Sequence, residues 1–154
     1  MRRMGLSETM GRQISLVVLG ALIVLLLILA VQGETAEIGN RVPASGGTYT
    51  NVAAPALKKM LESKDFVLVN VHVPYEGEIA RTDDFIPFNQ VEKQLHLLPP
   101  RKNAKIVLYC MSDRMSNIAA ETLVRLGYTN VWNLVGGMVD WRQRGYPLIS
   151  GPAK

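Results

Sequence analysis

The chain has 154 residues, of which 48% are hydrophobic, and a formal net charge of +4. The charge is modest and no segment combines clustered lysines and arginines with aromatic residues, so we expect no nucleic-acid partner. The single cysteine excludes an internal disulfide and a cysteine-based zinc site, which needs several thiolate or imidazole ligands. The residues that follow an apolar segment near the start are enough for one globular domain of ordinary size.

Residues 14–31 form an apolar stretch close to the roughly 20 residues that span a bilayer as a helix. Arg2, Arg3 and Arg12 precede the stretch, whereas acidic residues follow it before the next cation. The positive-inside rule therefore places residues 1–13 in the cytoplasm and the domain on the extracytoplasmic side.

The apolar stretch has two interpretations, a cleaved secretory signal and a retained signal anchor. We favour a single-pass anchor over residues 14–32, because no good small-x-small cleavage site follows it and its length exceeds that of a usual signal core. Residues 33–47 are rich in glycine, serine, proline and charged side chains, which predicts a linker. The domain is then expected over residues 48–150.

The first elements of the domain are predicted from short apolar patterns. Residues 48–50 suggest a short edge strand, and residues 52–61 have apolar side chains at helical spacing. Residues 66–71 are nearly continuous in apolar side chains, which predicts a buried strand of a sheet covered on both faces. The exception is Asn70, which must find hydrogen-bond partners if it is buried.

Residues 73–88 are dense in proline, glycine and acidic residues. A solvated surface loop near the crevice is the simplest interpretation; paired carboxylates for acid–base chemistry or metal binding are the alternative. A helix is predicted over residues 91–98, ended by two prolines. Neither His72 nor His96 has a histidine partner three or four residues away, so we expect no metal site. His72 follows the strand at 66–71 and remains a candidate auxiliary residue.

The only cysteine ends an apolar run at residues 106–109. This run predicts a buried parallel strand, and a helical pattern from Asn117 to a stop at Gly127 follows a short polar loop. Open α/β sheets place their ligand crevice outside the carboxyl ends of strands, where the next helix directs free N–H groups and its positive dipole end. From the apolar pattern alone, the simplest interpretation of Cys110 is a small buried hydrophobic residue. Its position at the carboxyl end of a parallel strand instead favours a nucleophile. Arg114 adds a cation, which stabilises a thiolate.

The last predicted elements are a strand over residues 128–134 and a glycine turn, Gly136-Gly137, that leads into a short helix ending near Trp141. Strands alternate with helices throughout the domain. This alternation predicts an α/β fold with a doubly wound, mostly parallel sheet flanked by helices.

Three motifs of the domain resemble the rhodanese (sulfurtransferase) family over roughly residues 50–148. One is the strand, cysteine, loop and helix of residues 107–128. The second is residues 130–141, which are similar to the family's closing glycine-glycine-to-tryptophan motif. The third and weaker motif is residues 69–72, where the family commonly has valine-aspartate-valine-arginine.

The resemblance implies a sulfurtransferase that needs no cofactor. Cys110 would take a sulfane sulfur from thiosulfate or a persulfide donor, hold it as a persulfide and pass it to a thiophilic acceptor. Asn70 and His72 stand as possible auxiliary residues. The substrate- and anion-binding loop implied by the resemblance consists of Met111, Ser112, Asp113, Arg114, Met115 and Ser116.

Departures from the family pattern keep a second hypothesis open. Asn70 and His72 replace the usual acid and arginine, and Met115 stands where arginine is frequent. The alternative is a non-catalytic, membrane-tethered rhodanese-like module that binds a partner or carries sulfur. A cysteine phosphatase is disfavoured, because its chemistry needs an arginine six residues after the cysteine, where this chain has Ser116.

Overall fold

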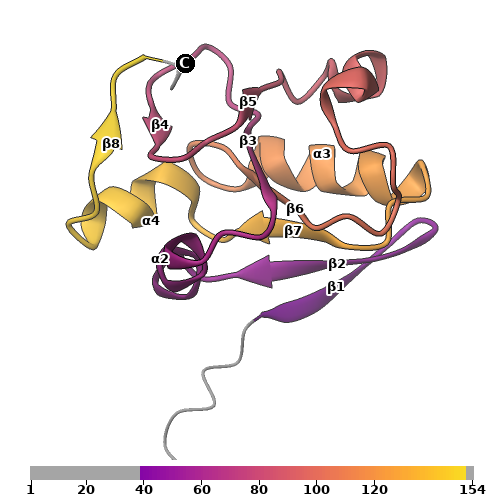
Figure 1. Cartoon of the computed structure of the whole chain (residues 1–154), viewed down its shortest axis with the longest axis horizontal. Helices are drawn as coiled ribbons and strands as arrows, with labels where there is room; N and C mark the ends of the chain where they lie inside the picture. The colour runs from indigo at the N-terminus through magenta and orange to yellow at the C-terminus, as the bar shows by residue number, and fades with distance from the viewer. Residues whose placement is uncertain (1–38, 152–154) are drawn as a thin grey trace, which may run out of the picture. The chain divides into compact units, whose positions relative to one another are not determined.

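The computed structural model describes residues 39–151, which form a main sheet and a small second sheet with helices around them (Figure 1). The elements are β1 (Asn40–Ala44), β2 (Gly47–Val52), α2 (Ala54–Glu62), β3 (Val67–Asn70), β4 (Glu78–Ile79), β5 (Asp84–Phe85), the 3-10 helix η1 (Val91–Leu97), β6 (Ile106–Tyr109), α3 (Arg114–Arg125), β7 (Val131–Leu134), α4 (Gly137–Gln143) and β8 (Leu148–Ile149). The main sheet has the order β1-β2-β7-β6-β3-β5. Its strands pair in parallel except for β1 with β2, while β4 and β8 pair antiparallel.

β6 lies in the interior of the sheet, and its side chains alternate between the two faces. Ile106, Leu108 and Cys110 belong to the hydrophobic core on the α3 side. Val107 and Tyr109 belong to the core that contains residues of α2 and α4. Alternate residues of a strand point to opposite faces, so both faces of the sheet are covered by helices. The predicted buried strand at 106–109 and the doubly wound arrangement are therefore confirmed.

The end of α3 determines where β7 begins. Gly127 has a φ of 87°, and its amide donates to the Val124 carbonyl at 2.9 Å. The Tyr128 amide donates to the Leu123 carbonyl at 3.0 Å. These two bonds form a Schellman motif, whose left-handed residue is usually glycine. Because Tyr128 takes part in this turn, β7 begins at Val131 and not at residue 128 as predicted.

β1 lies within residues 33–47, where the sequence predicts a linker. It is short and half-exposed to exposed, and it pairs with β2 from Asn40 opposite Asn51 to Ala44 opposite Gly47. The other neighbour of β2 is β7, so the predicted strand at residues 48–50 is interior and not at an edge. A polar strand of this length has no hydropathy signal of its own, because only its pairing defines it.

Two segments differ in form from the prediction. Residues 73–88 contain β4 and β5 and bury Glu78 and Ile79, so they are not simply a solvated loop. The described residues hold no group of three His, Cys, Asp or Glu side chains suited to a metal ion. Residues 91–98 contain η1, which is interrupted by non-helical angles at Gln94 and is not a regular α-helix.

Residues 1–13 and 14–32, predicted as a cytoplasmic tail and a membrane anchor, lie outside the described residues. Within 39–151, no helix is long and apolar enough to cross a bilayer. The anchor therefore stays a prediction.

Candidate active site

A cavity of about 140 Å³ lies where β3 and β6 end. Asn70 pairs with Tyr109 in the parallel register of these strands, so the residues that follow each strand meet at one edge of the sheet. The structure thus brings the predicted nucleophile, most of its loop and one auxiliary residue together. The cavity is lined by His72, Cys110, Met111, Ser112, Arg114 and Met115.

The Cys110 sulfur is almost fully buried and has two polar neighbours. The Asp113 amide donates to Sγ at 3.2 Å, and Ser116 Oγ lies 3.3 Å from Sγ. Ser116 is itself buried and donates its hydroxyl hydrogen to the Asp113 carbonyl at 3.0 Å. One hydroxyl hydrogen cannot serve two acceptors, so in this arrangement the Cys110 thiol donates to Ser116. The Asp113 amide can donate to a thiolate at the same position.

Asp113 fixes the shape of the loop. Its φ is 102°, a left-handed conformation that is uncommon outside glycine and that often occurs at functional sites. Its Oδ1 accepts the Gly136 amide at 2.8 Å. The carboxylate is therefore used to hold the loop against the turn before α4, and the amide of Asp113 is the group that faces the sulfur.

α4 supports the loop from the other side through the second glycine of the predicted turn. The Met138 amide donates to the Cys110 carbonyl at 2.9 Å, and the Val139 amide donates to the Met111 carbonyl at 3.0 Å. A Cβ on Gly137 would lie 2.7 Å from the Met111 carbonyl oxygen and still closer to that of Cys110. Glycine is thus required for this close approach. The sequence marked the turn, but nothing in it indicated which backbone the turn approaches.

Arg114 is the first residue of α3 and lines the cavity. The first-turn amides of a helix have no intrahelical partner, and its amino end carries the positive end of the dipole. The Arg114 side chain has no hydrogen bond or ion pair with another described residue. Its guanidinium is therefore available to an anion in the cavity.

The two predicted auxiliary residues have different positions. Asn70 is buried and does not line the cavity: its Oδ1 accepts the His72 amide at 3.0 Å, and its Nδ2 donates to the Gly77 carbonyl at 3.0 Å. It therefore shapes the turn after β3. His72 lines the cavity, and its Nε2 lies 2.6 Å from Glu76 Oε2. The sequence analysis did not identify Glu76 as a site residue. The signal that could have found it is an acidic residue four positions after a histidine.

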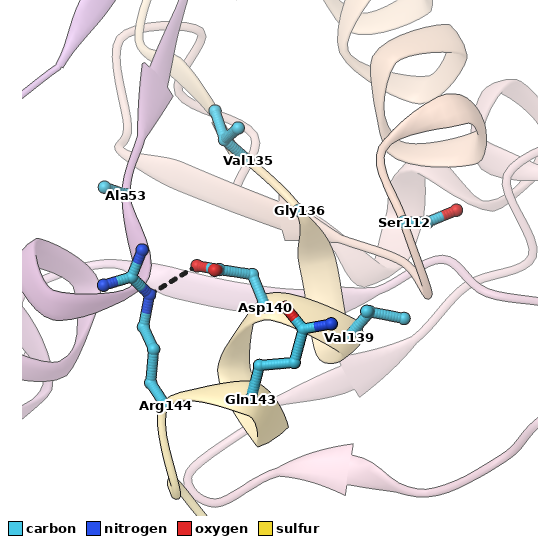
Figure 2. A pocket seen from close by; sticks show the side chains of 8 residues that line it. All are labelled: Ala53, Ser112, Val135, Gly136, Val139, Asp140, Gln143 and Arg144. Atoms are coloured by element: carbon cyan, nitrogen blue, oxygen red, sulfur yellow. Dashed lines mark hydrogen bonds and ion pairs between the residues drawn. The ribbon is translucent and has the colours of Figure 1, made fainter.

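A second cavity of about 380 Å³ lies against α4 and shares Ser112 with the first (Figure 2). Its charged side chains, Asp140 and Arg144, pair with each other at 2.7 Å. None of the residues that line it is a nucleophile of the kind that Cys110 provides, so the smaller cavity is the candidate active site. The larger cavity is lined by Ala53, Ser112, Val135, Gly136, Val139, Asp140, Gln143 and Arg144.

Comparisons with known proteins agree with this fold. A protein of Allochromatium vinosum called "Sulfurtransferase" is 32% identical over 98 residues, which are 60% of this chain and 87% of that protein. A tRNA uridine(34) hydroxylase of Buchnera aphidicola is 32% identical over 64% of this chain, but the match spans only 33% of that protein. The crystal structure of a rhodanese-like domain protein of Staphylococcus aureus has a TM-score of 0.55 and 27% identity, covering 65% of this chain and 98% of the other.

The family model of the rhodanese-like domain matches residues 53–144, a range that runs from the start of α2 to the end of α4 and includes Cys110 and its loop. The chain therefore belongs to the rhodanese-like domain family.

Proposed function

We propose that the protein is a sulfurtransferase that moves a sulfane sulfur from thiosulfate or a persulfide donor to a thiophilic acceptor through a persulfide on Cys110. The observation that carries this proposal is the Cys110 sulfur at the wall of a cavity, with the Asp113 amide donating to it at 3.2 Å. The relative from Allochromatium vinosum that bears the name sulfurtransferase supports the same activity.

In the first half of the reaction, the Cys110 thiolate attacks the outer sulfur of thiosulfate. A bond forms between Sγ and that sulfur, the sulfur–sulfur bond of thiosulfate breaks, and sulfite leaves with the electron pair. Arg114 and the first-turn amides of α3 would bind the donor's sulfonate oxygens, and the Asp113 amide would bind the charge left on the persulfide.

In the second half, a thiophilic acceptor attacks the outer sulfur of the persulfide. The new bond joins the acceptor to that sulfur, and Cys110 leaves as a thiolate that is ready for another cycle. No metal or redox cofactor takes part in either half, since each step exchanges one bond to sulfur for another.

Mass spectrometry of the intact protein tests the proposal. Full-length protein in mild detergent is incubated with thiosulfate or with glutathione persulfide, and we expect the mass of one sulfur atom to be added to the wild type but not to Cys110→Ser. Absence of the added mass with both donors would refute the enzyme. Loading without turnover to any thiol or cyanide acceptor would favour the sulfur-carrier hypothesis, which is supported by the departures from the family pattern at Asn70, His72 and Met115.

We further propose that residues 14–31 tether the domain to a membrane on the extracytoplasmic side. The support is the length of the apolar stretch and the arginines before it. Two reporters fused after Lys154 test this orientation. Alkaline phosphatase is active only outside the cytoplasm, whereas green fluorescent protein does not fluoresce when it is exported across the membrane unfolded. Activity of the phosphatase fusion is expected; fluorescence with an inactive phosphatase would reverse the orientation.

A further inference from the structure

A histidine–carboxylate pair borders the Cys110 cavity. His72 Nε2 lies 2.6 Å from Glu76 Oε2, and the side chains are 9% and 53% exposed. A carboxylate can only accept a hydrogen bond, so this contact keeps a proton on Nε2 of His72. Nδ1 is then the ring nitrogen that has a free lone pair.

The Nδ1 atom of His72 has no partner in the described part of the chain. It is buried and forms no hydrogen bond there. A buried ring nitrogen without a partner is unfavourable and needs an explanation. The imidazole is part of the wall of the Cys110 cavity, so the molecules that could reach this ring are those bound in that cavity.

The position of His72 is fixed by the strands and by Asn70. Tyr109 and Asn70 are register partners in β6 and β3, and the next two amides after Asn70 are both bound. The Val71 amide donates to the Tyr109 carbonyl at 2.9 Å, and the His72 amide donates to Asn70 Oδ1 at 3.0 Å. The histidine is thus held beside the nucleophile by backbone contacts that do not depend on a ligand.

We propose that His72, oriented by Glu76, is the general acid and base of the reaction, and that the site is matched to thiol persulfides as donors and thiols as acceptors. This inference rests on the proposed sulfurtransferase activity. Once a donor occupies the cavity that both residues line, the proton of the Cys110 thiol passes to His72 Nδ1, and Sγ attacks the outer sulfur of a persulfide RSSH. The Sγ–S bond forms, the S–S bond of the donor breaks, and the leaving thiolate takes the proton from Nδ1 and departs as RSH. With a thiol acceptor, the same proton moves in the reverse order.

The two donor classes make different demands on this site. A thiolate is a basic leaving group that benefits from a proton at the moment the S–S bond breaks. Sulfite is a stable anion and leaves from thiosulfate without one. His72 should therefore matter most for persulfides, whereas Arg114 should matter most for thiosulfate.

Single-turnover sulfur loading of the full-length protein in mild detergent tests this division. Intact-mass measurements follow the added sulfur over time, with glutathione persulfide or with thiosulfate as the donor. We expect His72→Gln to slow loading from glutathione persulfide roughly 100-fold and loading from thiosulfate by only about threefold. Glu76→Gln removes the charge of an exposed side chain but keeps a polar contact to His72, and we expect it to slow persulfide loading about tenfold.

The exposed His96 provides the matched control, because His96→Gln removes the other histidine of the chain and should leave both rates unchanged. An equal loss with both donors in His72→Gln and Glu76→Gln would show a structural role and overturn the inference, as would unchanged rates. Thermal unfolding of each variant checks its fold, and Glu76→Gln decides the question if His72→Gln does not fold. Failure of the wild type to load from either donor would instead overturn the proposed function itself.

Discussion

One of the two polar contacts of the Cys110 sulfur depends on a single hydroxyl hydrogen. Ser116 donates this hydrogen to the Asp113 carbonyl at 3.0 Å, and its Oγ lies 3.3 Å from Sγ. When Cys110 becomes a thiolate or a persulfide anion, rotation of the hydroxyl would direct the hydrogen to sulfur, where a charged acceptor gains more from it than a neutral carbonyl. Ser116 therefore responds to the charge of the nucleophile, whereas the Asp113 amide always points to it.

Replacing Ser116 by alanine tests this role. We expect loading from thiosulfate to slow about tenfold, because a hydrogen bond to a charged group contributes roughly 1.5–3 kcal/mol. The free energy of unfolding should fall by about 1 kcal/mol through loss of the bond to the Asp113 carbonyl. Loading kinetics and chemical denaturation measure the two effects, with the exposed Ser63→Ala as control. An unchanged loading rate in a folded Ser116→Ala protein would contradict the role.

Arg114 should discriminate between donors by charge. We expect Arg114→Gln to slow loading from thiosulfate about tenfold or more, since a charge-assisted contact to the sulfonate is lost, and to slow loading from glutathione persulfide less. Stability should change by less than about 0.5 kcal/mol, because the side chain is exposed. Arg101→Gln removes another exposed arginine and serves as the control. The same loss with both donors would assign Arg114 to general support of the loop.

The elements that periodicity defines could be predicted from the sequence, whereas those that only strand pairing defines could not. The strand at 106–109 and the helix after Cys110 have clear apolar patterns, and both are present. β1 and β4 have none, since β1 is defined by its pairing with the adjacent β2, and β4 by its pairing with the distant β8. The same holds in the site: the position of Cys110 was predictable, but its support by α4 depends on a contact between segments distant in sequence.

The contact between α4 and the loop is tested by a pair of glycine variants. Gly137→Ala introduces a Cβ where the Met111 carbonyl oxygen is 2.7 Å away, at a φ of 53°. Gly145 has a φ of 76°, but nothing lies within 4 Å of its Cβ position. Both variants have the cost of a left-handed alanine, about 1 kcal/mol. Only Gly137→Ala must also displace the loop, so we expect it to lose roughly 2–4 kcal/mol of stability and most of its sulfur loading.

Chemical denaturation and loading kinetics of the two variants separate the effects. Near-normal loading in Gly145→Ala with a strong loss in Gly137→Ala is the expected result. Equal behaviour of the two proteins would show that the backbone conformation, and not the close approach to the loop, is what glycine provides at residue 137.

At the scale of the whole molecule, a buried tyrosine connects the central strand to the segment after β3. The Ile79 amide donates to Tyr109 Oη at 3.0 Å, and Thr82 Oγ1 lies 2.6 Å from the same oxygen. Thr82 donates its own hydrogen to the Ile79 carbonyl at 2.6 Å, so the Tyr109 hydroxyl donates to Thr82. This network holds the 78–82 segment against β6, and with it the chain that carries Glu76.

The ionisation of this tyrosine links the fold to pH. Burial raises the pKa of Tyr109, and burial is also the largest cause of the raised pKa values of Tyr49 and Tyr75. In the unfolded chain tyrosines ionise near pH 10. Below that pH both states keep these protons, so the stability that the tyrosines contribute is fully present. Above it the unfolded state loses protons that the folded state retains, so the free energy of unfolding falls as pH rises.

Tyr109→Phe should change both the level and the slope of this dependence. At neutral pH we expect a loss of roughly 1–3 kcal/mol, because the Ile79 amide is left buried without its acceptor. Above pH 10 the variant should lose stability less steeply than the wild type, since one group that contributes about 1.4 kcal/mol per pH unit is absent. Denaturation followed by tryptophan fluorescence from pH 7 to 11.5 measures both.

Val107→Ala serves as the control, because it removes a buried side chain two residues before Tyr109 in β6. The cavity that it leaves costs roughly 2 kcal/mol, so this variant should shift the curve of stability against pH without changing its slope. If stability fell with pH at the same slope in the wild type and in both variants, the ionisation of Tyr109 would not contribute to the pH dependence, and this prediction would be wrong.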